Sequence, residues 1–242
     1  MSRRSIEAFS APEKVAAYDA DMELMHPNRS KMVGVAIEVL PHQGDAAVRA
    51  LDLGAGTGYF TARFLEAYPR AKVVAVDGAE AMLDLAKARL GDWGQSVEFR
   101  AGDFRDLCAL VPAPESVDVV YSSYALHHLD RREKTALAGD VLTLLRPGGW
   151  FLNADIIVAD APEVEARFQQ LRVEGIVRRA AGADPRFADH ATTRRYLDEM
   201  EAQAGDQPLT LEEELLVLCD GGLRDAAVYW LEYREAVTGG RK

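Results

Sequence analysis

The sequence contains little cysteine, and the two cysteines that it has do not form a pattern. Cys108 and Cys219 are far apart in a chain of 242 residues and show no metal-ligand spacing. A disulfide framework or a structural zinc site usually requires several cysteines at short, regular intervals. We therefore predict no metal site, and we expect both cysteines to pack in the core.

Long hydrophobic runs are also missing. The first ten residues contain Arg3 and Arg4 but no apolar stretch behind them, whereas a secretory signal or a membrane span needs a continuous apolar segment. We therefore expect a cytoplasmic protein that does not bind membranes.

Positive charge is scarce as well, since 28 lysines and arginines face 39 acidic residues and the formal net charge is −11. A surface that follows nucleic-acid phosphates needs a basic stripe, so we expect no nucleic-acid partner. The arginine pairs at 178–179 and 194–195 stand among acidic residues. Such pairs are typical of a solvated helix face.

The most informative segment that is present lies at residues 51–60 and reads LDLGAGTGYF. Apolar residues alternate with Asp52 at its start, which predicts a short buried strand. Gly54, Gly56 and Gly58 then allow a tight turn and close approach of a ligand to the backbone. A helix is expected from Tyr59 onward, so the segment predicts a cofactor loop between a strand and a helix.

The glycine spacing indicates which cofactor is expected. A dinucleotide fingerprint needs a small residue three positions after its second glycine, but Tyr59 occupies that place here. The G-x-G-x-G pattern, with Asp52 two residues before the first glycine, resembles the first motif of class I S-adenosylmethionine-dependent methyltransferases. The resemblance implies a Rossmann-like α/β fold. Its seven-stranded, mostly parallel sheet would end in a C-terminal antiparallel hairpin, with helices on both faces.

A second segment, residues 72–77, reads KVVAVD and predicts a parallel strand that ends in Asp77. A carboxylate at this place can accept hydrogen bonds from both hydroxyls of a ribose. The resemblance assigns Asp77 to the ribose of S-adenosylmethionine, with Gly78 directly after it. Met82 stands where the family packs an apolar side chain on adenine.

A third segment, residues 97–106, contains a short strand, Gly102, and then Asp103 and Phe104. By resemblance, the Asp103 carboxylate accepts from the adenine amine, and the backbone N–H of Phe104 donates to a ring nitrogen. In the alternative interpretation, Asp103 only caps a helix that starts near Arg105, as acidic residues readily do.

A fourth segment predicts a strand at 118–121, a helix at 130–145, a turn at Pro147, Gly148 and Gly149, and a fifth strand at 150–158. Ser122 follows the fourth strand, at the sheet edge where open parallel sheets collect ligands. Its backbone carbonyl is expected to receive the ammonium group of the cofactor. The C-terminal part predicts a helix at 209–218 and a strand pair at 225–238.

We expect one methyltransferase domain over residues 1–242. Its predicted parts are an N-terminal helical lid (1–45), a cofactor-binding core (46–158), a helical substrate cover (159–208) and a C-terminal helix with the hairpin (209–242). In the lid, Tyr18 belongs to a helical apolar stripe that normally packs on the sheet. Because the family often folds such a helix over the cofactor, Tyr18 is also a candidate cofactor contact.

Catalytic candidates follow the fourth strand. His127 and His128 are expected near the cleft, and an imidazole titrates in the range that a general base needs. Packing or backbone hydrogen bonding is the alternative role for either residue, and His26 is a weaker candidate. Asp52 is expected to support the methionine end of the cofactor.

These expectations describe an enzyme that transfers the methyl group of S-adenosyl-L-methionine to a small organic acceptor by in-line displacement, with S-adenosylhomocysteine as by-product. One alternative is an enzyme that modifies or transfers another part of the same cofactor. A non-catalytic regulator that only binds the cofactor is the other, because one fold carries many functions. The assembly is expected to be a monomer or a homodimer.

Overall fold

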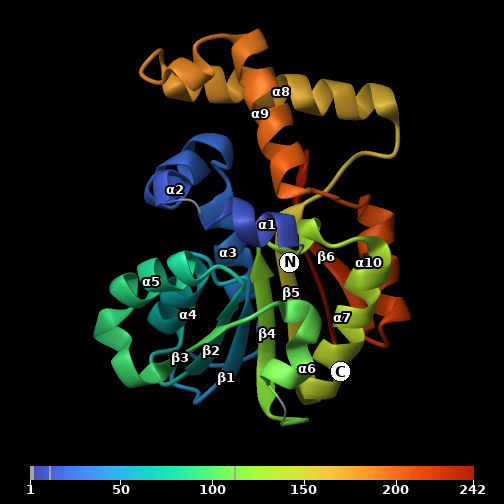
Figure 1. Cartoon of the computed structure of the whole chain (residues 1–242). Helices are drawn as coiled ribbons and strands as arrows, with labels where there is room; N and C mark the ends of the chain where they lie inside the picture. Colours follow the sequence, from blue (N-terminus) through green and yellow to red (C-terminus); the bar gives the residue numbers. More distant parts are fainter. Residues whose placement is uncertain (1–2, 11, 112) are drawn as a thin grey trace.

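The computed structural model describes residues 3–10, 12–111 and 113–242. In these ranges a seven-stranded sheet has the strand order β3-β2-β1-β4-β5-β7-β6 (Figure 1). β7 is antiparallel to both of its neighbours, whereas the other pairings are parallel. The strands are β1 (Arg49–Leu53), β2 (Lys72–Asp77), β3 (Val97–Ala101), β4 (Val117–Ser123), β5 (Leu145–Ile156), β6 (Arg224–Glu232) and β7 (Glu235–Arg241).

Helices connect these strands and also form a separate layer beyond the end of the sheet. The α-helices are α1 (Arg3–Ala8), α2 (Pro12–Met25), α3 (Arg29–Glu38), α4 (Tyr59–Ala67), α5 (Glu80–Arg89), α6 (Leu107–Leu110), α7 (Arg131–Leu144), α8 (Pro162–Ala180), α9 (His190–Ala204) and α10 (Leu211–Asp220). Short 3₁₀ turns lie at η1 (Gly91–Ser96), η2 (Phe104–Asp106), η3 (Leu126–His128) and η4 (Pro185–Phe187).

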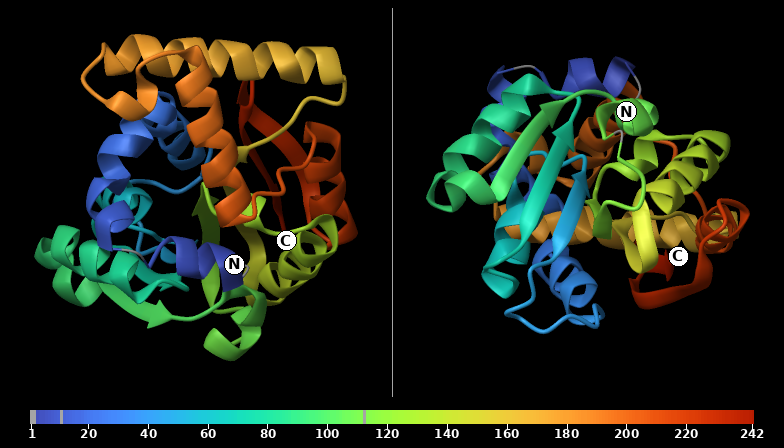
Figure 2. Two further views of the ribbon diagram at one scale, coloured as in Figure 1. Left: turned by 45° about the horizontal axis from the view of Figure 1, so that its top comes forward. Right: turned by 90° about the horizontal axis from the view of Figure 1, so that it is seen from below.

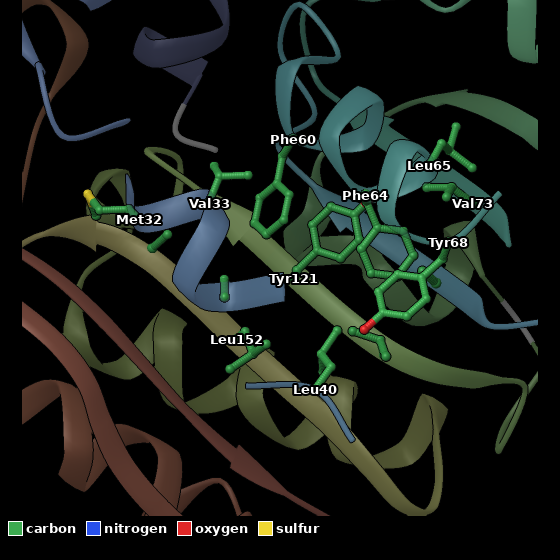
Figure 3. Packing of buried hydrophobic residues seen from close by; sticks show 14 of the residues in the cluster. Met32, Val33, Leu40, Phe60, Phe64, Leu65, Tyr68, Val73, Tyr121 and Leu152 are labelled. Carbon is green, nitrogen blue, oxygen red and sulfur yellow. The ribbon is translucent and has the colours of Figure 1, made fainter. Parts of the chain in front are cut away.

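Alternating side chains give the sheet two apolar faces. Ala50 of β1 and Tyr121 of β4 face the helices α3, α4 and α5, while Leu51 of β1 faces α6, α7 and α10. On the first face the rings of Phe60 and Phe64 pack against Tyr121, with centroids 4.2 and 4.9 Å away (Figure 3). Burial on both faces explains why β1, β2 and β4 are nearly continuous apolar runs.

The helices α8 and α9 form a third apolar cluster with Met25 of α2. Figure 1 shows both helices beyond the ends of the strands, next to α1 and α2. In the left view of Figure 2, α9 (orange) runs from α8 (gold) toward the sheet. The cover therefore lies over the edge of the sheet that carries the glycine loop.

The fold class predicted from the sequence is confirmed, and most elements lie close to their predicted positions. The C-terminal hairpin pairs β6 with β7 as expected. Thr210 and Asp130 cap α10 and α7 through capping boxes, which explains why these helices begin slightly later than predicted.

The predicted start of the fifth strand was wrong. β5 begins at Leu145 rather than at residue 150, and the predicted turn lies within it. The pairing of β5 with β4 jumps from Leu145 opposite Val117 to Trp150 opposite Val119. The Pro-Gly-Gly segment therefore forms an irregularity in the strand, and the positive φ of 79° at Gly148 accommodates it.

The predicted burial of the cysteines was also wrong, since Cys108 and Cys219 are both exposed. Each directly follows a buried leucine, Leu107 in α6 and Leu218 in α10. A helix turns about 100° per residue, so a neighbour of a buried position can easily face solvent.

Among the described residues, no helix combines the length and the apolar character that crossing a membrane requires.

Candidate cofactor and acceptor site

The glycine loop lies between β1 and α4, where all three glycines have positive φ angles. A Cβ at Gly54 would lie 2.3 Å from Cβ of Ala125, so only glycine fits there. At Gly58 the nearest atom to such a Cβ is Cδ1 of Leu90, 2.9 Å away. These two glycines let the loop pack closely on its neighbours.

Gly56 differs from the other two glycines, because a Cβ there would meet nothing closer than the carbonyl oxygen of Gly54, at 4.0 Å. Its backbone N–H donates to Oδ2 of Asp77 over 2.8 Å. The other Asp77 oxygen, Oδ1, accepts from the N–H of Ala79 over 2.8 Å. Asp77 therefore joins the glycine loop to the end of β2, while open space remains beside Gly56.

Asp52 is buried in β1, where its Oδ2 accepts from the hydroxyl of Thr61 over 2.5 Å. Burial raises the pKa of the Asp52 carboxyl to about 7, and the nearby charge of Asp77 adds to this. No arginine or lysine of the described residues forms an ion pair with Asp52. A buried carboxyl of this kind is suited to a cationic ligand, whose charge would compensate the carboxylate.

Asp103 lies after β3, at the start of η2. Its Oδ1 accepts from the backbone N–H of Arg105 over 2.9 Å, and its Oδ2 accepts from the Arg105 side chain. These contacts agree with the capping interpretation. Asp103 is only partly buried, so its carboxylate can still be reached from outside. Phe104 is fully buried. Its side chain belongs to the core on the α6 and α7 side of the sheet.

The adenine candidate Met82 is buried in a small cluster with Val15 of α2 and Ala79. Tyr18 packs against the same cluster, so the lid helix contacts the segment that follows β2. Gly78 lies between Asp77 and this cluster and is partly buried.

Helix α2 is also attached to the glycine loop by a polar network around Asp19. Oδ1 of Asp19 accepts from Arg29 over 2.9 Å and from the hydroxyl of Thr57 over 3.0 Å. Oδ2 accepts from Arg89 of α5 over 2.6 Å. Arg29 also lies over the ring of Tyr59, 4.0 Å from its centroid. Helix α2 therefore lies over the mouth of the loop.

Two cavities adjoin at this place. The loop cavity, of about 20 Å³, is lined by Tyr18, Arg29, Asp52, Gly54, Ala55, Gly56, Tyr59, Phe60, Ser123 and Tyr124. The cover cavity, of about 90 Å³, lies between the lid, the end of the sheet and α9. It is lined by Ala8, Phe9, Tyr18, Asp21, Met22, Met25, His26, Tyr124, His127, His128, Ile156, Arg172, Tyr196, Met200, Ala204 and Asp206. Tyr18 and Tyr124 line both cavities.

His127 is buried at the cover cavity and makes two contacts with Asp155 at the end of β5. Its Nδ1 donates to Oδ1 of Asp155 over 2.6 Å, and its backbone N–H donates to Oδ2 over 3.0 Å. Burial is the largest single influence on the pKa of His127 and lowers it, but the charge and hydrogen bond of Asp155, together with the charge of Asp206, outweigh burial and raise that pKa. The same pairing holds the pKa of Asp155 at about 2, although burial opposes it.

His128 is also buried, and its Nδ1 lies 3.0 Å from Oδ1 of Asp206. The Nε2 of His127 lies 3.7 Å from the same oxygen. Burial, together with the neighbouring His127, lowers the pKa of His128. The ligand atoms of these three residues all lie within 4.8 Å of one another, a spacing that a metal ion can bridge. Electrostatic pairing of His127 and His128 with Asp206 would explain the same arrangement without a metal ion. The absence of a metal site therefore stays a prediction.

The weaker candidate His26 belongs to a different cluster. Its Nδ1 lies 2.9 Å from Oε1 of Glu235, and the hydroxyl of Tyr124 donates to the same oxygen over 2.8 Å. Asn28 donates to Oε2 over 3.0 Å. These contacts tie the lid to β7, which favours a structural role for His26.

Ser122 is fully buried near the end of β4. Its hydroxyl donates to the carbonyl oxygen of Leu53 over 2.7 Å and so joins the ends of β4 and β1. This bond engages the side chain and leaves the proposed role of the Ser122 backbone carbonyl untested.

Sequence reasoning missed several site residues because tertiary structure brings them in from distant segments. Asp155 stands within a predicted strand, and Asp206 lies in the linker between α9 and α10. Asp19 is partly buried, but α2 contains other acidic residues close by, such as Asp21 and Glu23, so its place in the sequence does not single it out. The alternation around Asp155 offered one usable signal, since a lone acidic residue in the apolar run FLNADIIV contradicts the burial pattern.

A sequence model described as a methyltransferase domain matches residues 50–149, the part of the chain that contains β1 to β4 and the glycine loop. An uncharacterized methyltransferase of Anoxybacillus flavithermus is 34% identical over 128 residues, which is 52% of this chain and 56% of the relative. A malonyl-[acyl-carrier protein] O-methyltransferase of Methylococcus capsulatus is 38% identical over 109 residues, 45% of this chain and 37% of the relative. The matches thus span about half or less of these relatives.

The fold agrees with solved structures. An O-methyltransferase family protein from Burkholderia thailandensis superposes with a TM-score of 0.66 at 20% identity, covering 94% of this chain and 59% of the other. Three findings point to the same kind of protein. They are the sheet order with an antiparallel β7, the glycine loop after β1 and the sequence matches to methyltransferases. Residues 50–149 therefore form a methyltransferase domain, and the chain has the Rossmann-like fold of the class I S-adenosylmethionine-dependent methyltransferases.

Proposed function

We propose that this protein transfers the methyl group of S-adenosylmethionine to a small organic acceptor and releases S-adenosylhomocysteine. The observation that carries this proposal is the junction of the two cavities at Tyr18 and Tyr124. The glycine loop forms one side of the junction, and the buried histidines form the other. An acceptor in the cover cavity would lie beside the cofactor, as in-line displacement requires.

The residues around the loop cavity fit the cofactor. Asp52 is a buried carboxyl that pairs with no lysine or arginine in the described part of the chain, which suits the cationic methionine end. Asp77 stands at the end of β2 for the ribose, and the open space at Gly56 leaves room for a ligand at the backbone. When bound, S-adenosylmethionine supplies a methyl group that its sulfonium already activates.

We propose that the segment after β3 binds the adenine ring of S-adenosylmethionine. The Asp103 carboxylate would have to exchange its Arg105 contacts for the adenine amine, while the Phe104 N–H donates to the ring. Met82 would pack on the base from the α5 side. The Ser122 carbonyl keeps its proposed role at the ammonium group.

Within the cover cavity, His127 is the proposed proton acceptor. Asp155 binds Nδ1, so Nε2 is the nitrogen that can receive a proton from an acceptor hydroxyl. Asp155 is thus a positioning residue, because it fixes the ring and stabilises its protonated form. His128 pairs with Asp206 and is proposed to shape the cavity rather than to move a proton.

The acceptor is proposed to be small because the cover cavity has a volume of about 90 Å³ and is lined by the lid and by α9. The named relative from Methylococcus capsulatus is an O-methyltransferase, and an oxygen acceptor would use the histidine base proposed here. The division into lid (1–45), core (46–158), cover (159–208) and C-terminal part (209–242) belongs to this proposal. So do a monomeric or homodimeric state and a cytoplasmic location.

The proposal is tested by incubating the protein with S-adenosylmethionine carrying a labelled methyl group and with a metabolite extract. Mass spectrometry should find a product that carries the labelled methyl, together with S-adenosylhomocysteine. The Asp77→Ala variant is the control and should give much less of both.

Two other results would contradict methyl transfer. A product that carries a different part of the cofactor would point to another reaction in the same pocket. Tight binding of the cofactor without any turnover, across extracts and purified candidate acceptors, would support a non-catalytic regulator.

A further inference from the structure

A third cavity, of about 260 Å³, adjoins the cover cavity and is rich in arginine. The two cavities share Met25, His26, Ile156 and Arg172. We call the third one the arginine cavity. Its basic side chains are Arg172, Arg178 and Arg179 of α8 and Arg234 of the β6–β7 turn. Such a concentration is unusual in a chain with a formal net charge of −11.

The side chain of Arg179 is held in place by a backbone carbonyl and not by an ion pair with a carboxylate. Its Nε donates to the backbone carbonyl of Leu24 over 2.7 Å. The guanidinium lies over Gly175, one helical turn earlier, where a Cβ would come within 2.9 Å of Nη1. A neutral carbonyl and a glycine therefore fix the position of the group, and the charge of Glu235 acts on it only through space, without an ion pair.

Among the described residues, no carboxylate forms an ion pair with Arg178 or Arg179, whereas Arg172 pairs with Glu201 and Arg234 with Glu165. Burial and the neighbouring charge of Arg178 lower the pKa of Arg179. Crowding and partial desolvation of such a cation cost free energy, and a bound anion would offset that cost.

The acidic residues at this cavity do not supply the missing partner. Both oxygens of Glu235 are engaged by His26, Tyr124 and Asn28. Glu232 accepts from the same Asn28 over 3.3 Å. Glu235 is therefore bound to the lid and to Tyr124, and Glu232 is bound to the lid. The two arginines remain open to a ligand.

We propose that the arginine cavity binds a carboxylate or phosphate group of the methyl acceptor. This inference rests on the proposed function, since it makes the acceptor a molecule with two ends. The anionic end lies between Arg178 and Arg179, and the end that is methylated lies near His127. Guanidinium groups bind both kinds of oxyanion through paired hydrogen bonds.

The lining between the two ends suggests the chemistry of the connecting part. Met25, Ile156, Phe168 and Leu171 lie along the arginine cavity and are apolar. An apolar or aromatic linker would bury its surface there. The two cavities, of about 90 and about 260 Å³, together lie near the lower end of the range for ligand sites in proteins, which begins at about 300 Å³. The acceptor is therefore expected to be a small organic acid or phosphate ester.

The direct test measures anion binding by calorimetric titration in a buffer of low chloride and constant ionic strength. The probes are inorganic phosphate and succinate, which distinguish a phosphate from a carboxylate preference. We expect saturable binding of at least one probe to the unmodified protein. Arg179→Gln should weaken it roughly tenfold to a hundredfold, the effect of losing a hydrogen bond between charged groups.

Two further variants separate anion binding from folding and from general electrostatics. Gly175→Ala keeps every charge but displaces the Arg179 guanidinium, and it should also weaken binding. Arg195→Gln removes an exposed arginine of α9 outside this cavity and should leave binding unchanged. No saturable binding of either probe, or equal loss in Arg179→Gln and Arg195→Gln, would overturn the inference.

Once an acceptor is identified, turnover gives a second readout. Arg179→Gln should raise KM for the acceptor about tenfold or more and change kcat little, because it acts away from the reacting atoms. A methylated product without an anionic group would refute the inference while leaving methyl transfer intact. Anion binding in a protein that transfers no methyl group would refute the proposed function instead.

Discussion

The Nδ1 of His127 lies 2.6 Å from Oδ1 of Asp155, and the second oxygen of the same carboxylate accepts the backbone N–H of His127. One acidic residue therefore fixes both the ring and the backbone of the candidate base. Because Asp155 raises the pKa of His127 above its ordinary value of 6.5, the free base forms only at higher pH. The logarithm of kcat/KM should rise with pH through an ionisation above 6.5.

Asp155→Asn should lower kcat by roughly a hundredfold or more, the usual contribution of a positioned acid or base. The same variant should shift the ionisation toward lower pH, because the imidazolium loses its anionic partner. The measurement is the pH profile of turnover for both proteins. An unshifted profile in a folded Asp155→Asn variant would exclude the positioning role.

We expect the affinity for S-adenosylmethionine to depend on pH because of Asp52. Burial raises the pKa of Asp52 to about 7, so near neutral pH part of the protein carries a protonated carboxyl. A cationic ligand favours the carboxylate, and binding should therefore release a proton. Affinity should be full above this pKa and fall as pH decreases below it, by up to about tenfold per pH unit.

Calorimetry of S-adenosylmethionine binding in two buffers of different ionisation enthalpy would detect that proton release. In Asp52→Asn the release should disappear, and the affinity should become nearly independent of pH over about one unit on either side of pH 7. Proton release that persists in this variant would assign the effect to another group.

Asp77→Ala should weaken binding of S-adenosylmethionine by about 1.5–3 kcal/mol, the usual cost of losing hydrogen bonds to a charged group. The structure adds a second consequence, because Asp77 also accepts from the N–H groups of Gly56 and Ala79. Asp77→Asn keeps the shape and one oxygen acceptor, so it serves as the matched control. If both variants bind the cofactor as tightly as the unmodified protein, the ribose role is wrong.

Substitution by alanine should have different effects on stability and on cofactor binding at Gly54 and at Gly56. At Gly54 the new Cβ would lie 2.3 Å from Ala125, so Gly54→Ala should cost about 1–3 kcal/mol of unfolding free energy from overpacking, in addition to its positive φ. Gly56→Ala meets no close atom and should cost less, but it should reduce cofactor affinity. Urea denaturation and calorimetric titration measure the two effects, and equal losses of stability would contradict this distinction.

Much of the fold could be predicted because its signals are local. The run KVVAVD becomes β2 from Lys72 to Asp77, and the glycine loop joins β1 to α4 as expected. Errors arose where a local rule competed with sheet pairing. Pro147 and two glycines predict a turn, yet β5 continues through them, since Leu145 and Trp150 both find partners on β4.

The site was less predictable, because its charged partners meet only after folding. His127 was a candidate from its position after β4, but Asp155 and Asp206 come from β5 and from the linker after α9. The interpretation of Arg178 and Arg179 as a solvated face holds for Arg178, which is exposed, but not for Arg179. The bond from Arg179 to Leu24 spans 155 positions, which no pattern along the chain reveals.

The attachment of α2 through Asp19 has a kinetic consequence. Asp19 contacts Arg29, Thr57 of the glycine loop and Arg89 of α5. Because these contacts hold α2 over the glycine loop, they would also retain the spent nucleoside after the reaction. We therefore expect departure of S-adenosylhomocysteine to limit turnover, and donor and acceptor to enter in a compulsory order before α2 closes over them.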